Sequence, residues 1–253
     1  MPKNIVQPAS EWATGNRSPH PQIADRHLGA PCADLAMTPA IARWIIETYT
    51  SPGEIICDPN PGLGIVLAET VHAGRHALAL PTEPRWESTM QANLDLARLV
   101  HNAGHATLLK GADDPRDADL PGAIDLVLTG LRHTPASDPS QVLVGLYEDL
   151  NAIADWIWPG GHVVITCRPW CCHGCLVDLA GAIHEAVDAV GLIPALLTPF
   201  HGAQLRTPLH NLSCGEAPES TDLHSRPTAQ GQSAVFAFQL PPSAPHSMKG
   251  GGQ

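Results

Sequence analysis

The sequence predicts an α/β fold in which helices cover both faces of a doubly wound, mostly parallel β-sheet with an antiparallel edge strand. Short apolar runs of the kind found in buried strands alternate along the chain with longer segments of helical periodicity. The first of these runs, Glu54–Cys57, leads into Asp58 and a turn that contains Gly62 and Gly64, and a helix follows. A strand, a Gly-rich turn and a helix in this order build a nucleotide-sized crevice at the carboxyl end of the strand.

The chain divides into an irregular N-terminal arm at residues 1–36, one domain at residues 37–240, and a tail at residues 241–253. The arm is rich in Pro, His and Ala and shows no periodicity. The tail ends in Gly-Gly-Gly-Gln, and we expect it to be disordered. No internal repeat is evident.

Glycine and proline mark where the expected helices begin and end. Thr38 can cap the first helix and Pro39 suits its first turn, while Gly74 closes the second helix and Gly104 the third. The expected helices are, in order, residues 38–49, 65–73, 84–103, 142–156 and 176–190. Four apolar residues should form the inward face of the third helix: Leu94, Leu96, Leu99 and Val100.

Each expected strand is a short, mostly apolar run bounded by turn residues. Pro159-Gly160-Gly161 is expected to turn the chain into the fifth strand, and residues 111–122 and 132–139 are expected loops. The last strand is expected to pair antiparallel at the sheet edge. The expected strands are residues 54–57, 76–80, 106–110, 124–129, 162–166, 192–197 and 235–240.

Composition indicates a globular protein, because 43% of the 253 residues are apolar and 15% are charged. Residues 1–10 lack the apolar segment of a signal peptide, and no apolar run approaches the roughly 20 residues that span a membrane. Seven cysteines, an odd number in a chain without export signals, favour reduced thiols. We therefore expect a cytoplasmic protein that does not contact membranes.

The charge balance argues against strong, unassisted binding to DNA. The formal net charge is −11, the chain has only three lysines, and its arginines are scattered. Affinity for duplex DNA comes largely from neutralising phosphates, so DNA is expected to be a weak partner. An arginine patch assembled by folding, or a protein partner, would change that expectation.

The Gly-rich turn resembles the cofactor loop of the S-adenosylmethionine-dependent DNA methyltransferases that methylate exocyclic amines of adenine or cytosine. That loop typically reads D-P-F-x-G-x-G, and Asp58, Pro59, Gly62 and Gly64 match it, with Asn60 in place of the aromatic residue. The resemblance covers roughly residues 10 to 200 and implies a class I methyltransferase-like Rossmann fold. Further segments match in the same order: residues 37–43, 49–54, 74–75, 83–86, 125–129 and 158–166.

The resemblance implies S-adenosylmethionine as the cofactor, with its methionine end over Asp58–Gly64. The family places an acid at the end of the second strand to hold the ribose. Here that position is Pro81, so Glu83 is the candidate, against the alternative that Glu83 is a helix N-terminal acid favoured by the helix dipole. Asp113 is the candidate contact to the adenine amine, or else a solvated loop acid.

The resemblance also aligns Gly130-Leu131-Arg132-His133 with the family's catalytic S-P-P-Y or D-P-P-Y tetrapeptide. In the family, the first side chain and a backbone carbonyl accept hydrogen bonds from the target amine, and the aromatic residue stacks on a flipped base. Gly130 has no side-chain acceptor, which leaves backbone carbonyls and Thr129 as candidates. Leu131 and Arg132 replace the prolines, and His133 is the candidate stacking residue.

The segment after the fifth strand carries two candidate nucleic-acid contacts, Arg168 and Trp170, whose alternative role is to pack the strand end beneath the following helix. Cys172 and Cys175 have C-x-x-C spacing, with Cys171 and His173 nearby. A second pair at short spacing is missing, so we expect no metal site here, with a metal or redox site as the alternative.

Two functions remain open from the sequence. The first is an active S-adenosylmethionine-dependent methyltransferase, by resemblance one that methylates exocyclic amines in DNA. The second is a catalytically inactive, methyltransferase-like module that binds the cofactor or a protein partner. The intact Gly62/Gly64 turn favours cofactor binding in either case, whereas Gly130 and the net charge favour the second.

Overall fold

The structure is a computed structural model, and it describes residues 36–80, 83–99, 101, 103–110, 120–133, 137–168, 170–172, 175–195 and 234–242. For Cys171, Cys172, Cys175, Leu176 and Ala234 it describes the backbone only. Most of the expected arm, Asp113 and most of the expected tail therefore lie outside the described residues.

A seven-stranded sheet forms the centre of the molecule, in the order β3-β2-β1-β4-β5-β9-β8. The neighbours among β1 to β5 pair in parallel, whereas β9 pairs antiparallel with both β5 and β8. The doubly wound, mostly parallel sheet expected from the sequence is confirmed. The strands span Ile55–Asp58 (β1), His76–Ala79 (β2), His105–Leu108 (β3), Ile124–Gly130 (β4), Ile157–Cys167 (β5), Ile193–Pro194 (β8) and Ala234–Gln239 (β9).

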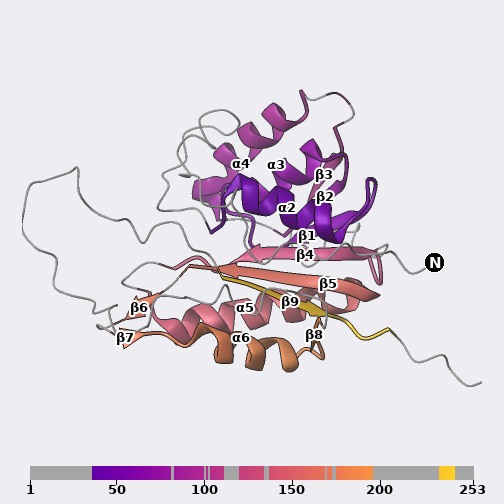
Figure 1. The fold of residues 1–253 in the computed structure, drawn as a ribbon. Helices are drawn as coiled ribbons and strands as arrows, with labels where there is room; N and C mark the ends of the chain where they lie inside the picture. The colour runs from indigo at the N-terminus through magenta and orange to yellow at the C-terminus, as the bar shows by residue number, and fades with distance from the viewer. Residues whose placement is uncertain are drawn as a thin grey trace, which may run out of the picture.

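Helices pack on both faces of this sheet, as Figure 1 shows. On one face lie α2 (Pro39–Tyr49), α3 (Ile65–His72) and α4 (Pro84–Ala97), and on the other lie α5 (Pro139–Ile153) and α6 (Leu179–Asp188). Alternate strand residues point to the two faces. Leu126 and Leu128 accordingly pack with α2 and α3, while Val127 packs with α5 and α6.

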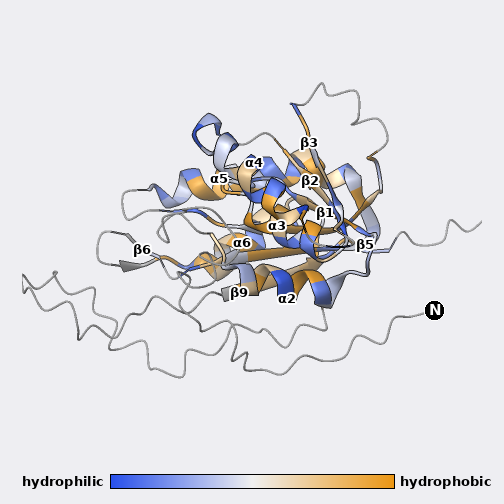
Figure 2. Ribbon diagram, turned by 90° about the horizontal axis from the view of Figure 1, so that it is seen from above, coloured by the Kyte–Doolittle hydropathy of each residue, from blue (hydrophilic) through white to orange (hydrophobic). Residues whose placement is uncertain are grey.

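The hydropathy of the elements follows these layers. Figure 2 shows apolar strands between helices that carry hydrophilic residues along part of their surface. Burial of the apolar residues of β1, β4 and β5 supplies the main favourable free energy of such a core. Among the described residues, no helix combines the length and apolarity needed to cross a bilayer.

Strand order reverses between β1 and β4, because β2 and β3 extend the sheet on one side of β1 and β5 extends it on the other side of β4. Ligands of open α/β sheets bind outside the carboxyl ends of the strands at such a switch point. Asp58 ends β1 and Gly130 ends β4. The fold therefore brings together the two sequence segments that the resemblance singled out.

Several element boundaries differ from the expectation. Helix α4 ends at Ala97 rather than 103, so Leu99 is not on the inward face and is 80% exposed. Helix α5 begins early, at Pro139, because the Asp138 side chain accepts a hydrogen bond from the amide of Ser140 at 2.9 Å.

The other differences arise from strand pairing. Strand β5 already begins at Ile157, and Gly160, with a φ of 96°, lies inside it where the β4–β5 register shifts, not in a preceding turn. Helix α6 begins at Leu179, because Leu176 instead pairs with Cys171 in a small hairpin that the sequence analysis missed. That hairpin consists of β6 (Cys171–Cys172) and β7 (Cys175–Leu176).

Candidate functional site

The loop from Asp58 to Gly64 joins β1 to α3 at the switch point. Gly62 and Gly64 have φ values of 49° and 77°, in the left-handed region that favours glycine. Gly64 donates its amide to the carbonyl of Pro61 at 2.8 Å and is the N-cap of α3. Asp58 accepts a hydrogen bond from the amide of Asn60 at 3.1 Å. The turn is thus fixed by its own backbone and by the carboxylate that precedes it.

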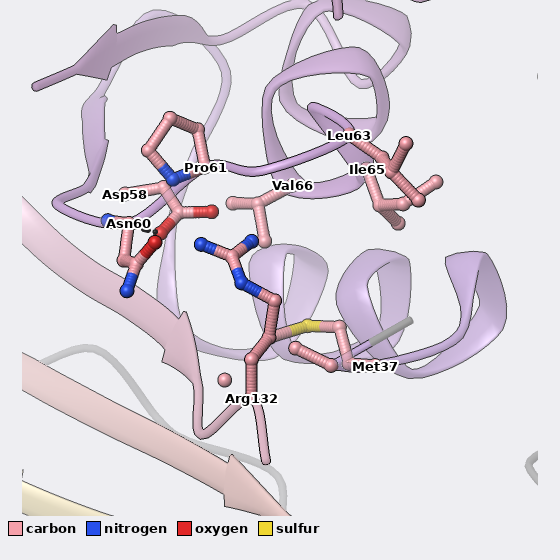
Figure 3. A pocket seen from close by; sticks show the side chains of 10 residues that line it. Met37, Asp58, Asn60, Pro61, Leu63, Ile65, Val66 and Arg132 are labelled. Carbon is pink, nitrogen blue, oxygen red and sulfur yellow. Dashed lines mark hydrogen bonds between the residues drawn. The ribbon is translucent and has the colours of Figure 1, made fainter. Parts of the chain in front are cut away.

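A hollow of about 300 Å³, a volume that includes space open to solvent, lies beside this loop. The loop, the start of α3, the end of β4 and the residues before α2 line it. Figure 3 shows how these side chains face one another. The lining residues are Ala36, Met37, Asp58, Asn60, Pro61, Leu63, Ile65, Val66, Gly130 and Arg132.

The side chain of Arg132 extends through this hollow toward Asp58 and the loop (Figure 3). A Cβ built on Gly62 would overlap Nη1 of Arg132 and lie 2.7 Å from its Cζ. The guanidinium therefore lies directly against the Cα of Gly62. The sequence analysis had considered Arg132 only as the replacement for a proline and did not find this contact.

Three acidic side chains act on the guanidinium of Arg132: Asp58, Glu83 and Asp149. Burial lowers the pKa of Arg132, and these three carboxylates oppose that shift. Asp149, from α5, also receives a hydrogen bond from the side chain of Asn60. Sequence reasoning missed Asp149, because no local motif links a mid-helix acid to a loop about ninety positions earlier.

Asp58 is the most strongly perturbed acid of the site. Burial raises its pKa to about 7, while Arg132, the Asn60 amide and the Thr129 side chain pull it down. Burial likewise raises the pKa of Asp149 to about 6. Two carboxyls near the switch point whose pKa values are raised toward neutrality are typical of a binding or catalytic site.

The candidate ribose contact, Glu83, lies at the N-cap position of α4, but its side chain makes no capping hydrogen bond. Instead it pairs with Arg85 at 2.8 Å between Oε2 and Nε, with both side chains largely exposed. Its electrostatic influence on Arg132 places it near the hollow. The other candidate acid, Asp113, lies outside the described residues.

The aligned tetrapeptide is closed in by its surroundings. A Cβ on Gly130 would lie 2.6 Å from the Cβ of Ala36 and 3.1 Å from Oγ1 of Thr166. Leu131 is buried, and its amide donates to the carbonyl of Thr166 at 2.8 Å. Thr129 is also buried, and its hydroxyl bonds to Asp58. The hydroxyl of Thr129 is thus already engaged with Asp58, and its role as an acceptor for a substrate stays a prediction.

Trp170 was expected to contact nucleic acid, but its side chain is 1% exposed. It stacks on His133 with ring centroids 4.3 Å apart and an angle of 10° between the rings. The alternative, that Trp170 packs the strand end, is the one that fits. Since Trp170 covers one face of His133, only the other face of that ring is available to a flat ligand.

His133 is half-buried, and its Nε2 lies 3.3 Å from the carbonyl oxygen of Arg168. Burial lowers its pKa, which favours the neutral ring. Arg168 is half-buried, and contact between it and nucleic acid stays a prediction. The cysteine cluster lies outside the described side chains, and its expected lack of a metal likewise stays a prediction.

No known protein-family model matches the chain, and no curated protein matches it. Among solved structures, the precorrin-6y C5,15-methyltransferase of Geobacter metallireducens GS-15 superposes with a TM-score of 0.50 at 15% identity, covering 85% of this chain and 95% of that one. The strand order and helix layers agree with this likeness. The chain has the class I methyltransferase fold.

Two further solved structures superpose with lower TM-scores. A TehB-like SAM-dependent methyltransferase of Corynebacterium glutamicum gives a TM-score of 0.47 at 14% identity, covering 79% of this chain and 86% of that one. The magnesium protoporphyrin IX methyltransferase of Synechocystis PCC 6803, solved with bound SAM, gives 0.44 at 12% identity, covering 79% and 76%. At these identities the likeness concerns the class I methyltransferase fold alone.

Proposed function

We propose that the protein binds S-adenosylmethionine and is a methyltransferase. The observation that carries this proposal is the position of the Asp58–Gly64 loop. It leaves β1 at the switch point, and its residues Asp58, Asn60, Pro61 and Leu63 line a hollow that Gly130, at the end of β4, also lines. Glycine in this loop lets a ligand approach the main chain closely.

The residues around the hollow fit the chemical groups of this cofactor. Asp58 and Asn60 offer acceptors for its ammonium and hydroxyl groups, and Leu63, Ile65 and Val66 offer an apolar wall. When bound, S-adenosylmethionine supplies an electrophilic methyl group. The protein's own part is to hold the ligand, to exclude water and to align an acceptor. The site has room for the ligand only once Arg132 leaves the face of Gly62.

The methyl acceptor that we propose is an exocyclic amine of a DNA base, on the strength of the motif order along the chain. The free face of the His133 ring offers a stacking surface for a base, and the backbone carbonyls near Gly130 are the candidate acceptors for its amine. With a formal net charge of −11, the chain would need a basic protein partner, or a DNA site whose strands are already separated, to hold DNA.

A second candidate is a methyltransferase-like module without catalysis. It is favoured by the packing of Gly130 beneath Ala36 and by the burial of Leu131 and Thr129. At the position where the family has a side-chain acceptor, this chain has Gly130, and these contacts enclose it. In this case the hollow would still bind the cofactor.

Calorimetric titration with S-adenosylmethionine and S-adenosylhomocysteine tests the proposal. We expect a Kd below about 100 μM, equivalent to roughly −5.5 kcal/mol. Gly62→Ala should weaken binding at least about tenfold, because its methyl group enters the hollow. Gly53→Ala is the matched control, since Gly53 also has a positive φ, of 87°, but lies in a distant turn with nothing near its Cβ position.

Methyl transfer from labelled S-adenosylmethionine to single- and double-stranded DNA separates the two candidates. Incorporation that Gly62→Ala abolishes would support the enzyme. Cofactor binding with no incorporation would favour the non-catalytic module. No binding heat, together with no ligand-induced rise in melting temperature, would contradict both.

A further inference from the structure

The class I methyltransferase fold places the ligand of the Gly-rich loop over Gly62, yet in this chain a side chain of the protein lies there. The guanidinium of Arg132 occupies the space where a Cβ on Gly62 would lie, and the side chain extends toward Asp58 (Figure 3). This is not a loose surface contact. Arg132 lies in the segment directly after β4. This segment is fixed by the hydrogen bond from the amide of Leu131 to the carbonyl of Thr166 at 2.8 Å.

The charges around this guanidinium match a cationic group. Asp58, Glu83 and Asp149 all act on it as negative neighbours, and Arg85 acts in the opposite sense. Asp58 is buried, and a buried carboxylate needs a nearby cation or donors to stay charged. Arg132 supplies that cation in this structure.

S-adenosylmethionine carries two positive groups, a sulfonium and an ammonium, at its methionine end. That end is the part that the proposed function places over the Asp58–Gly64 loop. A guanidinium and a sulfonium or ammonium cannot both occupy the space over Gly62. They would also compete for the same carboxylates. In addition, two cations brought into one weakly solvated site repel each other strongly.

We propose that Arg132 is the residue that sets cofactor affinity, because its guanidinium occupies the place of the cationic end of S-adenosylmethionine and must leave before the ligand enters. The side chain of Arg132 thereby closes the site in this structure. This inference rests on the proposed function. It implies that the apparent Kd equals the intrinsic Kd divided by the fraction of molecules in which Arg132 has left Gly62.

Calorimetric titration of four proteins with S-adenosylmethionine tests this inference: the natural chain, Arg132→Ala, Arg132→Gln and Arg98→Ala. Arg132→Ala removes both bulk and charge from the hollow. Arg132→Gln removes the charge and keeps much of the bulk, and it also serves if the alanine variant does not fold. Arg98→Ala is the matched control, because it removes an equal charge from an exposed side chain that pairs with Asp95 at the far end of α4.

We expect Arg132→Ala to lower the Kd at least about tenfold, Arg132→Gln to lower it less, and Arg98→Ala to leave it within about twofold. Binding by the arginine variants alone, with none by the natural chain, would support the inference further. An equal or weaker affinity in Arg132→Ala while the natural chain binds would overturn it and leave the proposed function intact. No binding by any of the four folded proteins would overturn the proposed function, and this inference with it.

Discussion

The carboxylate of Glu69 on α3, which is completely buried, accepts hydrogen bonds from Nε and Nη2 of Arg43 on α2 at 2.9 and 2.7 Å. This pair ties together the two helices that flank the Gly-rich loop. We expect Arg43→Ala to lower the free energy of unfolding by about 3 kcal/mol, because it leaves a buried carboxylate without its cation. Urea denaturation measures this loss.

The matched variant for this pair is Glu69→Gln in the Arg43→Ala background. It removes the stranded charge, so we expect it to recover part of the lost stability. A loss below about 0.5 kcal/mol in Arg43→Ala would place this contact among ordinary surface ion pairs.

The contact between Arg132 and Gly62 can be tested without a ligand. Gly62→Ala should destabilise the protein through its positive φ and through the overlap of its methyl group with the guanidinium. In the Arg132→Ala background only the first cost remains. We expect the two substitutions to be coupled by about 1 kcal/mol or more in a double-mutant cycle of unfolding free energies. Simple additivity would show that Arg132 does not lie on Gly62 in solution.

Gly130 has no room for a larger side chain. Its Cβ position lies 2.6 Å from the Cβ of Ala36, so we expect Gly130→Ala to cost about 1–3 kcal/mol and Gly130→Asp to cost more. Replacing Gly130 with the family's acid would therefore not restore an acceptor by itself. Gly145→Ala is the control, because this glycine lies in α5 with open space around it and alanine there should stabilise by up to about 1 kcal/mol. Thermal denaturation distinguishes the loss of stability expected for Gly130→Ala from the gain expected for Gly145→Ala.

Trp170 packs as a core residue, so we expect Trp170→Ala to cost about 3–5 kcal/mol. Trp170→Phe should cost much less, because it keeps an aromatic ring against His133 and removes an indole N–H that has no hydrogen-bond partner among the described residues. Wild-type stability in Trp170→Ala, as measured by urea denaturation, would return Trp170 to the surface role that the sequence had suggested.

The sheet could be predicted from the sequence because its strands are short apolar runs separated by glycines, and the loop Asp58–Gly64 could be placed because it follows the first run directly. The end of α4 could not be placed in this way. Leu99 fits the apolar period of that helix, but α4 stops two residues earlier and the residue faces solvent. Periodicity records which residues could share a face, and tertiary packing decides where the helix ends.

The electrostatic interactions of the site could not be predicted from the sequence, for a different reason. Arg132 and Asp149 belong to a loop and a helix that meet Asp58 only when β1 and β4 pair. No spacing along the chain encodes that contact. The sequence left Trp170 open between a nucleic-acid contact and a packing role, and the hairpin of β6 and β7, which follows Trp170 directly, was not predicted. Sequence reasoning therefore placed the Asp58–Gly64 loop at the switch point but did not find the arginine that lies on it.

The pKa of Asp58, raised to about 7 by burial, makes stability depend on pH in a direction that can be worked out. An unfolded Asp has a pKa near 3.9, so between about pH 4 and 7 the folded state binds a proton that the unfolded state has released. The free energy of unfolding should then fall as pH rises through this window. Three pKa units correspond to roughly 4 kcal/mol at most. Asp149, with its pKa raised to about 6, acts in the same direction, whereas the lowered pKa of His133 acts in the opposite one.

Asp58→Asn isolates this contribution, because it keeps the shape of the side chain and removes its titration. We expect the stability of Asp58→Asn relative to the natural chain to increase steadily from pH 5 to pH 8 in urea denaturation series. A constant difference across that range would show that Asp58 stays ionised throughout, with Arg132 outweighing the cost of burial.

Arg132→Ala should have the opposite consequence to Asp58→Asn. It removes the cation that lowers the pKa of Asp58, so it should steepen the fall in stability above pH 7.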